Sequence, residues 1–303
     1  MTRSSSPLFA FIAIAGVAGT AVAQPNPTFS YGNAADVKDV KSVEWTATAE
    51  AGLIVTTGNA RTTSVAATGR AARVDPRNKL EAQLSLAYAR ATIRNAADAD
   101  GSGAIEADEL VETATTTANA WQGKLRYDRF LTDSNSLYVA ALASADRPAG
   151  KELVGGGQAG YSRRLFKDER HEVVAELGYD FSYEDLSVGD PLSIHSARAF
   201  AGYKGTIDDK TAVEGSLEVL TNLNTLATLP EESSALADTR VNAGAAVNTK
   251  LTEDISLSVS IAVRYDNRPA PLPPFGVPFA GGFTPVADEL DTITKATLIV
   301  SLF

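Results

Sequence analysis

The residues whose spacing most clearly predicts chemistry lie in DADGSGAIEADEL, residues 98 to 110. An EF-hand calcium loop places oxygen ligands at positions 1, 3, 5, 7, 9 and 12, with Gly at position 6 for a sharp turn. These positions are filled by Asp98, Asp100, Ser102, the Ala104 carbonyl, Glu106 and Glu109, with Gly103 at the turn. Four converging carboxylates need a hard divalent cation, so residues 98–109 predict a calcium site, with calcium as cofactor. An acidic loop of turn-forming residues is the alternative.

The segments around this loop do not have the pattern of EF-hand helices. LSLAYARATIRN alternates in hydropathy, and VETATTTANAW is rich in β-branched threonine, which favours strands. We therefore expect a single calcium loop between the third and fourth strands, with at most a turn or two of helix. Without a paired helix there is no groove to open, so a calmodulin-like sensor is not expected.

A second glycine-rich motif occurs in VGGGQAG, where Gly155, Gly157 and Gly160 satisfy G-x-G-x-x-G. Phosphate binding by this motif requires a helix to follow. YSRRLF follows instead and has a strand pattern. Close backbone packing or a bend in a barrel wall is the better interpretation.

Alternation of period two dominates the rest of the chain. HEVVAELGYDFSYED, residues 171 to 185, places Leu177 and Tyr179 on one face and Glu176 and Asp180 on the other, which is typical of a strand with one apolar face. Similar alternation predicts about twelve strands, near residues 43–57, 61–73, 79–94, 118–130, 136–146, 152–165, 171–185, 193–207, 210–222, 237–250, 254–267 and 288–303. Many exceed the ~5 to 6 residues usual in soluble sheets.

Connections of unequal length separate these strands. Short polar turns such as DPRN, TDSN and KDER alternate with longer loops. An even strand number with short turns at one end is the layout of an outer-membrane barrel, in which charges are tolerated in the lumen but not against lipid. The expected fold is an all-β, antiparallel transmembrane barrel; a soluble β-sandwich is the alternative.

Composition and the first residues agree with this fold. Arg3, the apolar run from Leu8 to Val22 and the small residues before Gln24 predict a signal peptide over residues 1–23. A retained membrane anchor is the alternative. The chain has no cysteine, and its net charge of -10 argues against nucleic acid as a partner. We expect outer-membrane lipid and calcium as partners, in the outer membrane of a Gram-negative bacterium.

The stretch AEAGLIVTTGNARTTSVAATGRAARVDPRNKLEAQLSLAYA has a Thr-Gly-Asn turn between two strands, followed by a charged strand. In this it resembles the salt-induced outer-membrane protein family, a barrel family without an assigned biochemical function. The resemblance covers about Trp45 to Phe303 and implies an outer-membrane barrel. It supplies no catalytic residues.

An enzyme is the main functional alternative. Calcium-dependent outer-membrane phospholipases resemble one another in placing His and Ser two residues apart on one strand face. Here Ala197 stands where the nucleophile should be, and Ser196 points away from His195 because neighbours on a strand face opposite ways. Ser193 shares a face with His195, which leaves a calcium-dependent lipid hydrolase as the alternative.

The expected organisation is a signal peptide (1–23), a periplasmic segment (24–42) and a barrel (43–303) whose extracellular loop 95–117 carries the calcium loop. The expected function is a non-enzymatic barrel, structural or a narrow pore. Acidic residues expected in the lumen suggest a preference for cations if a pore exists; they are Glu172, Glu176, Asp180, Glu214 and Glu218. The proline-rich loop 268–285 is expected to fold over the barrel mouth or contact a partner; a stiff exposed loop is the alternative.

Overall fold

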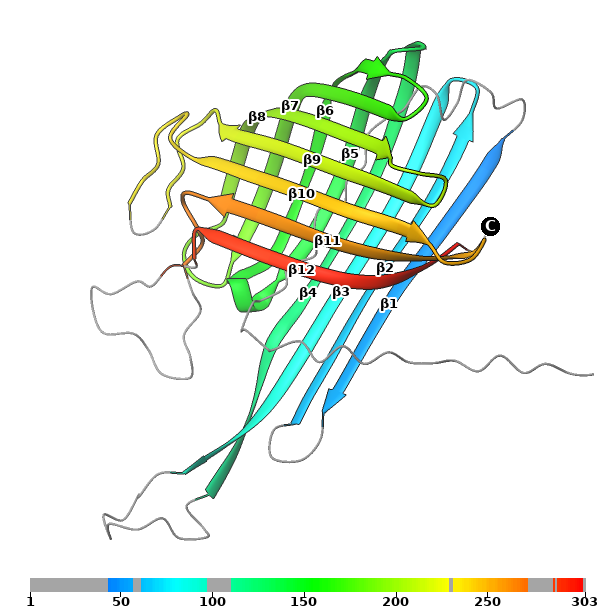
Figure 1. Ribbon diagram of the computed structural model, residues 1–303. Coiled ribbons are helices and arrows are strands. Elements are labelled where there is room, and N and C mark those ends of the chain that lie inside the picture. Colours follow the sequence, from blue (N-terminus) through cyan, green and yellow to red (C-terminus); the bar gives the residue numbers. More distant parts are fainter. Residues whose placement is uncertain are drawn as a thin grey trace, which may run out of the picture.

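The computed structural model describes residues 43–56, 61–96, 110–228, 231–271, 286 and 288–301. In these residues twelve antiparallel strands form one closed barrel, in which each strand pairs with its neighbours in the sequence and β1 pairs with β12 (Figure 1). The predicted barrel is therefore confirmed, and the soluble sandwich is wrong. No helix within the described ranges is long and apolar enough to cross a membrane.

The strand bounds follow the predicted pattern closely. They are β1 (Glu44–Thr56), β2 (Arg61–Asp75), β3 (Asn78–Ala96), β4 (Leu110–Thr132), β5 (Asn135–Asp146), β6 (Lys151–Lys167), β7 (His171–Leu186), β8 (Leu192–Thr206), β9 (Thr211–Asn222), β10 (Thr239–Lys250), β11 (Ile255–Asp266) and β12 (Leu290–Ser301). A short 3-10 helix, η2 (Arg147–Ala149), joins β5 to β6.

The connection between β3 and β4 differs from the prediction. Residues 95–117 were expected to form a loop, but β3 continues to Ala96 and β4 starts at Leu110. Arg90 pairs with Thr116 and Ala96 with Leu110, so the hairpin continues beyond the residues that pair with β2 and β5. The physical reason is the run of threonines at the start of β4, since β-branched residues fit a pleated strand better than a loop.

The two faces of each strand follow the expected alternation, with polar residues inside. On β7, Leu177 is 67% exposed on the outside of the barrel, whereas Glu176 is 2% exposed on the inside. On β11, Val259 is exposed and Ser258 is buried. This arrangement is the reverse of a water-soluble core and matches a barrel with lipid outside and a polar lumen.

Tyrosines on the outer surface mark the end of the barrel that has short turns. In the β3–β4, β5–β6 and β7–β8 hairpins, a tyrosine of the second strand forms a hydrogen bond through its hydroxyl with the first residue of the first strand. The pairs are Tyr127 with Asn78 (2.7 Å), Tyr161 with Asn135, and Tyr203 with His171 (2.8 Å). Aromatic girdles with a polar tip are typical of the membrane–water boundary of such barrels.

Aspartates close the short turns. In the β6–β7 turn, the Asp168 carboxylate accepts hydrogen bonds from the backbone N–H groups of Arg170 (2.8 Å) and His171 (2.6 Å). In the β8–β9 turn, the Asp208 carboxylate accepts hydrogen bonds from the backbone N–H groups of Lys210 and Thr211. The bond from the Arg170 N–H, followed by that from His171, lowers the pKa of Asp168 below its ordinary value.

The opposite end of the barrel carries the longer connections. Between β9 and β10, Leu226 is buried against Leu192 and Ile194 of β8. Both β8 residues lie on the lumen side of their strand, so this connection covers part of the mouth. Of the proline-rich loop 268–285, residues 272–285 lie outside the described part of the chain, and Pro271 pairs with Val286.

Among the described residues, the seam between β1 and β12 has the shortest pairing in the barrel. It consists of three residue pairs, from Thr48↔Ser301 to Glu50↔Ile299. From there the two strands diverge toward the end with long loops (Figure 1). Each strand remains paired along its other edge, β1 with β2 and β12 with β11.

Candidate functional site in the barrel lumen

An arginine on β4 forms the centre of a polar network inside the barrel. The Arg126 guanidinium binds Glu176 of β7 through two hydrogen bonds, of 2.7 and 3.1 Å. It also binds Asp128 on its own strand, at 2.7 Å. Side chains alternate between the two faces of a strand. Arg126 and Asp128 occupy inward-facing positions of β4, and Glu176 occupies an inward-facing position of β7. All three are almost fully buried, so they narrow the lumen at this level.

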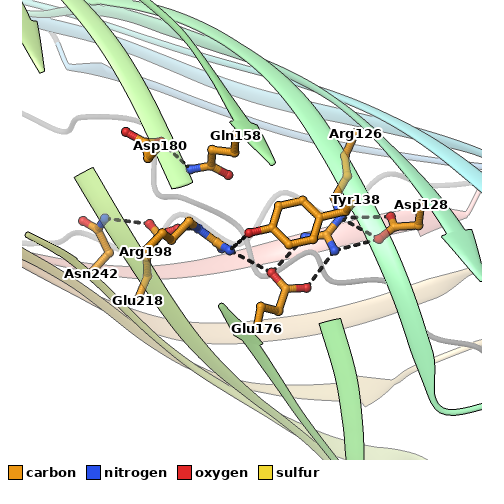
Figure 2. A network of polar contacts seen from close by, with 9 residues as sticks. All are labelled: Arg126, Asp128, Tyr138, Gln158, Glu176, Asp180, Arg198, Glu218 and Asn242. Carbon is orange, nitrogen blue, oxygen red and sulfur yellow. Dashed lines mark hydrogen bonds and ion pairs between the residues drawn. The ribbon is translucent and has the colours of Figure 1, made fainter. Parts of the chain in front are cut away.

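A second arginine extends the network toward β9 and β10. Arg198 of β8 donates hydrogen bonds to Glu176 (2.9 Å) and to Glu218 of β9 (2.6 Å). The Asn242 side chain donates to the other oxygen of Glu218, at 3.0 Å. Figure 2 shows these side chains converging from several strands of the wall. Residues far apart in sequence are thereby fixed by charge-assisted hydrogen bonds, which are stronger than neutral ones.

Tyr138 of β5 bridges the two arginines. Its hydroxyl accepts a hydrogen bond from Arg198 at 2.8 Å, and the Arg126 guanidinium lies 4.3 Å from the ring centroid. The phenol passes over a pair of facing glycines, Gly160 of β6 and Gly178 of β7. A Cβ atom at Gly160 would lie 2.7 Å from the Tyr138 hydroxyl, and one at Gly178 would lie 2.5 Å from it. The predicted role of Gly160 in close packing is therefore confirmed.

The network lies nearer the end of the barrel with short turns. Arg126 is in the second half of β4, which ends at Thr132, and Glu176 is in the first half of β7, which starts at His171. Lys124 faces the lumen one inward position away from Arg126 and interacts electrostatically with Glu218 and Glu176. The charges of three cations and three carboxylates balance here. The cations are Lys124, Arg126 and Arg198, and the carboxylates are those of Asp128, Glu176 and Glu218. The lumen is therefore constricted here by a charge-neutral group of side chains.

A cavity of about 290 Å³ lies beside the constriction and extends toward the end with long loops. Residues from β3 to β11 line it, including Lys124, Gln158, Asp180, Ser182, Glu218 and Arg264.

At the rim of the cavity, Glu184 binds Arg240 at 2.8 Å and Lys151 at 3.2 Å. Arg240 also lies 3.6 Å from Asp238. Glu184 and Asp238 at this end of the lumen are thus paired with cations as well.

The structure modifies the expectation of a lumen selective for cations. Glu172, Glu176 and Asp180 are buried on the inward face, and Glu218 shares that face and binds Arg198. Glu214 has the same strand parity as Glu218. The sequence analysis identified these acids but missed Arg198 and Tyr138. The alternation of β8 and β5 places both residues on the inward face and could have identified them. Because the arginines neutralise Glu176 and Glu218, these two acids do not provide a negative lumen.

The histidine considered for hydrolysis lies on the outer surface. The ring of His195 contacts the Tyr179 hydroxyl through Nδ1 and packs 5.2 Å from the Phe181 ring. Its backbone N–H donates to Asn224. Ser193 is on the same face, but the hydrogen bond of the His195 ring goes to Tyr179. The described contacts are those of an aromatic cluster at the outer surface.

The predicted calcium ligands lie outside the described residues, because 97–109 are not among them. In the described part of the chain, no group of three or more His, Cys, Asp or Glu residues could hold a metal ion.

Comparison with known proteins gives a family and a set of distant barrels. No curated protein matches the chain. The NanC porin is 12% identical, with 85% of this chain and 100% of the porin covered and a TM-score of 0.44. OmpT, an outer-membrane protein of Vibrio cholerae, is 9% identical, with 87% of this chain and 99% of OmpT covered and a TM-score of 0.35. The anion-selective porin from Comamonas acidovorans is 8% identical, with 86% of this chain and 99% of the porin covered and a TM-score of 0.37. With TM-scores below 0.5, these likenesses carry no information on function.

The family match covers most of the barrel. Residues 49–274 match the family described as "Protein of unknown function, DUF481". This range begins within β1 and extends past the end of β11. The chain therefore belongs to the DUF481 family.

Proposed function

We propose that this protein is a non-enzymatic outer-membrane barrel that acts as a narrow pore, constricted by the Arg126–Glu176–Arg198 network. The observation that carries the proposal is the buried bidentate contact between Arg126 and Glu176, which joins strands three positions apart across the lumen. Polar side chains that line a lumen set the size and charge of what can pass. A neutral constriction below a polar cavity fits a pathway for small solutes.

The location in an outer membrane is part of the proposal. The apolar outer face and the tyrosines bonded to the turns support contact with lipid, and the signal segment predicted from residues 1–23 supports export. Lipid of the outer membrane is then the partner of the exposed residues, among them Leu177 and Val259.

Single-channel recording in a planar bilayer tests the pore. Arg126→Ala combined with Glu176→Ala removes a matched cation and anion, so the lumen widens without a change in net charge. We expect small unitary currents from the natural chain and an increase of about twofold or more in the double variant. The exposed pair Arg147 and Glu152, 3.2 Å apart, provides the control when both are changed to Ala. The absence of current from both the natural chain and the double variant would indicate a purely structural barrel.

We also propose that residues 98–109 bind calcium and order the tip of the β3–β4 hairpin. Support comes from the complete set of ligand positions in the sequence and from the β3–β4 hairpin that holds both ends of the loop. Calcium would cross-link carboxylates that otherwise repel one another. Affinity of about 10⁻⁴ to 10⁻³ M is expected, as in extracellular modules.

Proteolysis with and without a chelator tests the calcium loop. Chelation should expose residues 97–109 to cleavage while the heat-dependent gel migration of the barrel stays the same. Glu109→Ala removes the closing bidentate ligand and should reproduce the effect of the chelator with calcium present. Cleavage that is the same under all three conditions contradicts calcium binding and leaves an acidic loop.

The hydrolase alternative has a direct assay. We expect no calcium-dependent ester hydrolysis by the purified barrel. Activity that disappears in His195→Ala would show that the protein is an enzyme.

A further inference from the structure

Asp180, a buried carboxylate of the lumen, forms no ion pair with a cation of the described residues. Asp180 of β7 is 8% exposed, and its carboxylate accepts a hydrogen bond from the Gln158 side chain, from Nε2 to Oδ1 at 2.9 Å. No ion pair joins it to another residue of the described ranges. Glu184 and Glu218, which line the same cavity, are each bound by arginine. Asp180 is therefore a buried carboxylate of the cavity wall without an ion pair in the described ranges, on which Arg198 and Arg240 act only at longer range.

Gln158 has an incomplete set of hydrogen bonds as well. Its amide nitrogen serves Asp180, but its amide oxygen Oε1 is buried and accepts no hydrogen bond within the described structure. Gln158 is 6% exposed and lines the cavity together with Asp180. Figure 2 shows the two side chains as a contact separate from the Arg126 cluster. A carboxylate and an amide oxygen, both of them acceptors, thus lie next to each other in the cavity wall.

Such a pair is costly unless something donates to it. A buried ionised carboxylate without a cation and a buried carbonyl without a donor each carry a desolvation penalty. A metal ion is a poor match, since Mg²⁺ and Ca²⁺ require six or more oxygen ligands, and the described residues form no cluster that could hold a metal ion. A primary ammonium carries one positive charge and three donors, which suits a carboxylate, an amide oxygen and one water.

We propose that the lumen cavity binds small organic molecules through a protonated primary amine, with Asp180 as counter-ion and the Gln158 amide oxygen as second acceptor. The volume of about 290 Å³ is at the small end of ligand pockets, so the rest of the ligand is a few heavy atoms. The inference deepens the proposed pore by naming a solute class, and it rests on that proposal only in requiring that the cavity be reached from the aqueous side.

A reporter cysteine measures binding without relying on conduction. The natural chain has no cysteine, and Ser182, the next inward position on β7 after Asp180, lines the cavity. The rate at which a maleimide alkylates Ser182→Cys in refolded protein is compared in the presence of n-butylammonium, n-butanol and butyrate, which have similar size and different charge. We expect n-butylammonium alone to slow labelling by about tenfold at saturation, since one bound ligand excludes the reagent.

Two variants establish the chemistry of the protection. Asp180→Asn keeps the shape and the contact with Gln158 but removes the charge, so protection by n-butylammonium should be lost while the gel migration of the folded barrel is unchanged. A second reporter, Ser193→Cys on the outer face of β8, should label at a rate that does not respond to any of the three compounds.

The outcomes separate this inference from the pore. Equal protection by n-butanol, protection that persists in Asp180→Asn, or a Ser182→Cys thiol that does not react at all would overturn the inference. Calorimetric titration of n-butylammonium into the natural chain and Asp180→Asn checks the result without a thiol, and heat in both or in neither contradicts it. A barrel that passes no current but shows protection dependent on Asp180 would reject the pore and retain the binding site.

Discussion

At the scale of single residues, the lumen depends on where side chains are absent as much as on where they are present. Tyr138 reaches Arg198 because Gly160 and Gly178 leave the space that its phenol occupies. Charge balance then decides which groups remain open to a ligand. Arg126 and Arg198 neutralise Glu176 and Glu218, whereas Asp180 is bound by an uncharged amide.

Gly160→Ala tests the role of this space. The added Cβ would lie nearest to the Leu177 carbonyl oxygen of β7, 2.7 Å from the Tyr138 hydroxyl and 2.8 Å from the Cα of Gly178, so the strand and the phenol must shift. We expect a loss of folding stability of about 1 to 3 kcal/mol, as for overpacked cores, measured by urea unfolding of the refolded barrel. Gly155→Ala, where a Cβ meets nothing within 4 Å, is the matched control. Equal effects of the two changes would mean that the barrel does not need the space at Gly160.

At the scale of elements, alternation was sufficient to predict the strands and their faces. The pattern of residues 171–185 gave β7 and placed Glu176 and Asp180 inside, as observed. Alternation shows which face of a strand a residue lies on, but it does not show which strands come into contact across the lumen. The contacts of Arg198 with Tyr138 and of Arg126 with Glu176 could therefore not be predicted. The start of β4 was missed because threonine is compatible with both a polar loop and a strand.

The aspartate turns give a dependence on pH. The pKa of Asp168 is lowered in the folded state by hydrogen bonds from the Arg170 and His171 N–H groups. The ionised form is therefore favoured by folding, and its contribution is present above the ordinary pKa and lost as pH falls through the lowered value. Acid should thus destabilise the β6–β7 turn.

Asp168→Asn tests this dependence. The amide oxygen can accept the same two hydrogen bonds and does not titrate, so the variant should lose less stability between neutral and acidic pH than the natural chain. Hydrogen exchange of the Arg170 and His171 amides reports the turn locally. The same acid response in both proteins would contradict a role for the Asp168 charge.

At the scale of the whole molecule, polar residues face inward and apolar residues face outward around a barrel closed by β1 and β12. This inversion is the reason for assigning the exterior to lipid, and it makes the lumen, not the exterior, the place for a functional site. Among the described residues, three residue pairs join β1 to β12 at the seam of the wall. The resemblance to the salt-induced outer-membrane family stays a prediction beside the shown membership of the DUF481 family.

A change of one exterior residue tests the assignment to lipid energetically. Val259 is half exposed on the outer face of β11, so Val259→Arg should reduce the stability of the membrane-folded barrel by about 2 to 4 kcal/mol if it lies near the bilayer midplane. Ser260→Arg places the same charge on the inward face of the same strand and should cost far less. Folding titrations in vesicles compare the two, and equal costs would mean that the faces are wrongly assigned.

The most direct measurement of the central claim is depth-resolved quenching along β7. Single cysteines, introduced one at a time from Leu177 to Tyr183 in a chain without cysteine, carry a fluorophore and are quenched by brominated lipid in vesicles. A transmembrane barrel with a polar lumen predicts strong lipid quenching at Leu177, Tyr179 and Tyr183, and weak quenching at Asp180 and Ser182, because neighbours on a strand face opposite sides. Quenching that is equal at all positions, or absent throughout, would contradict the barrel in the membrane.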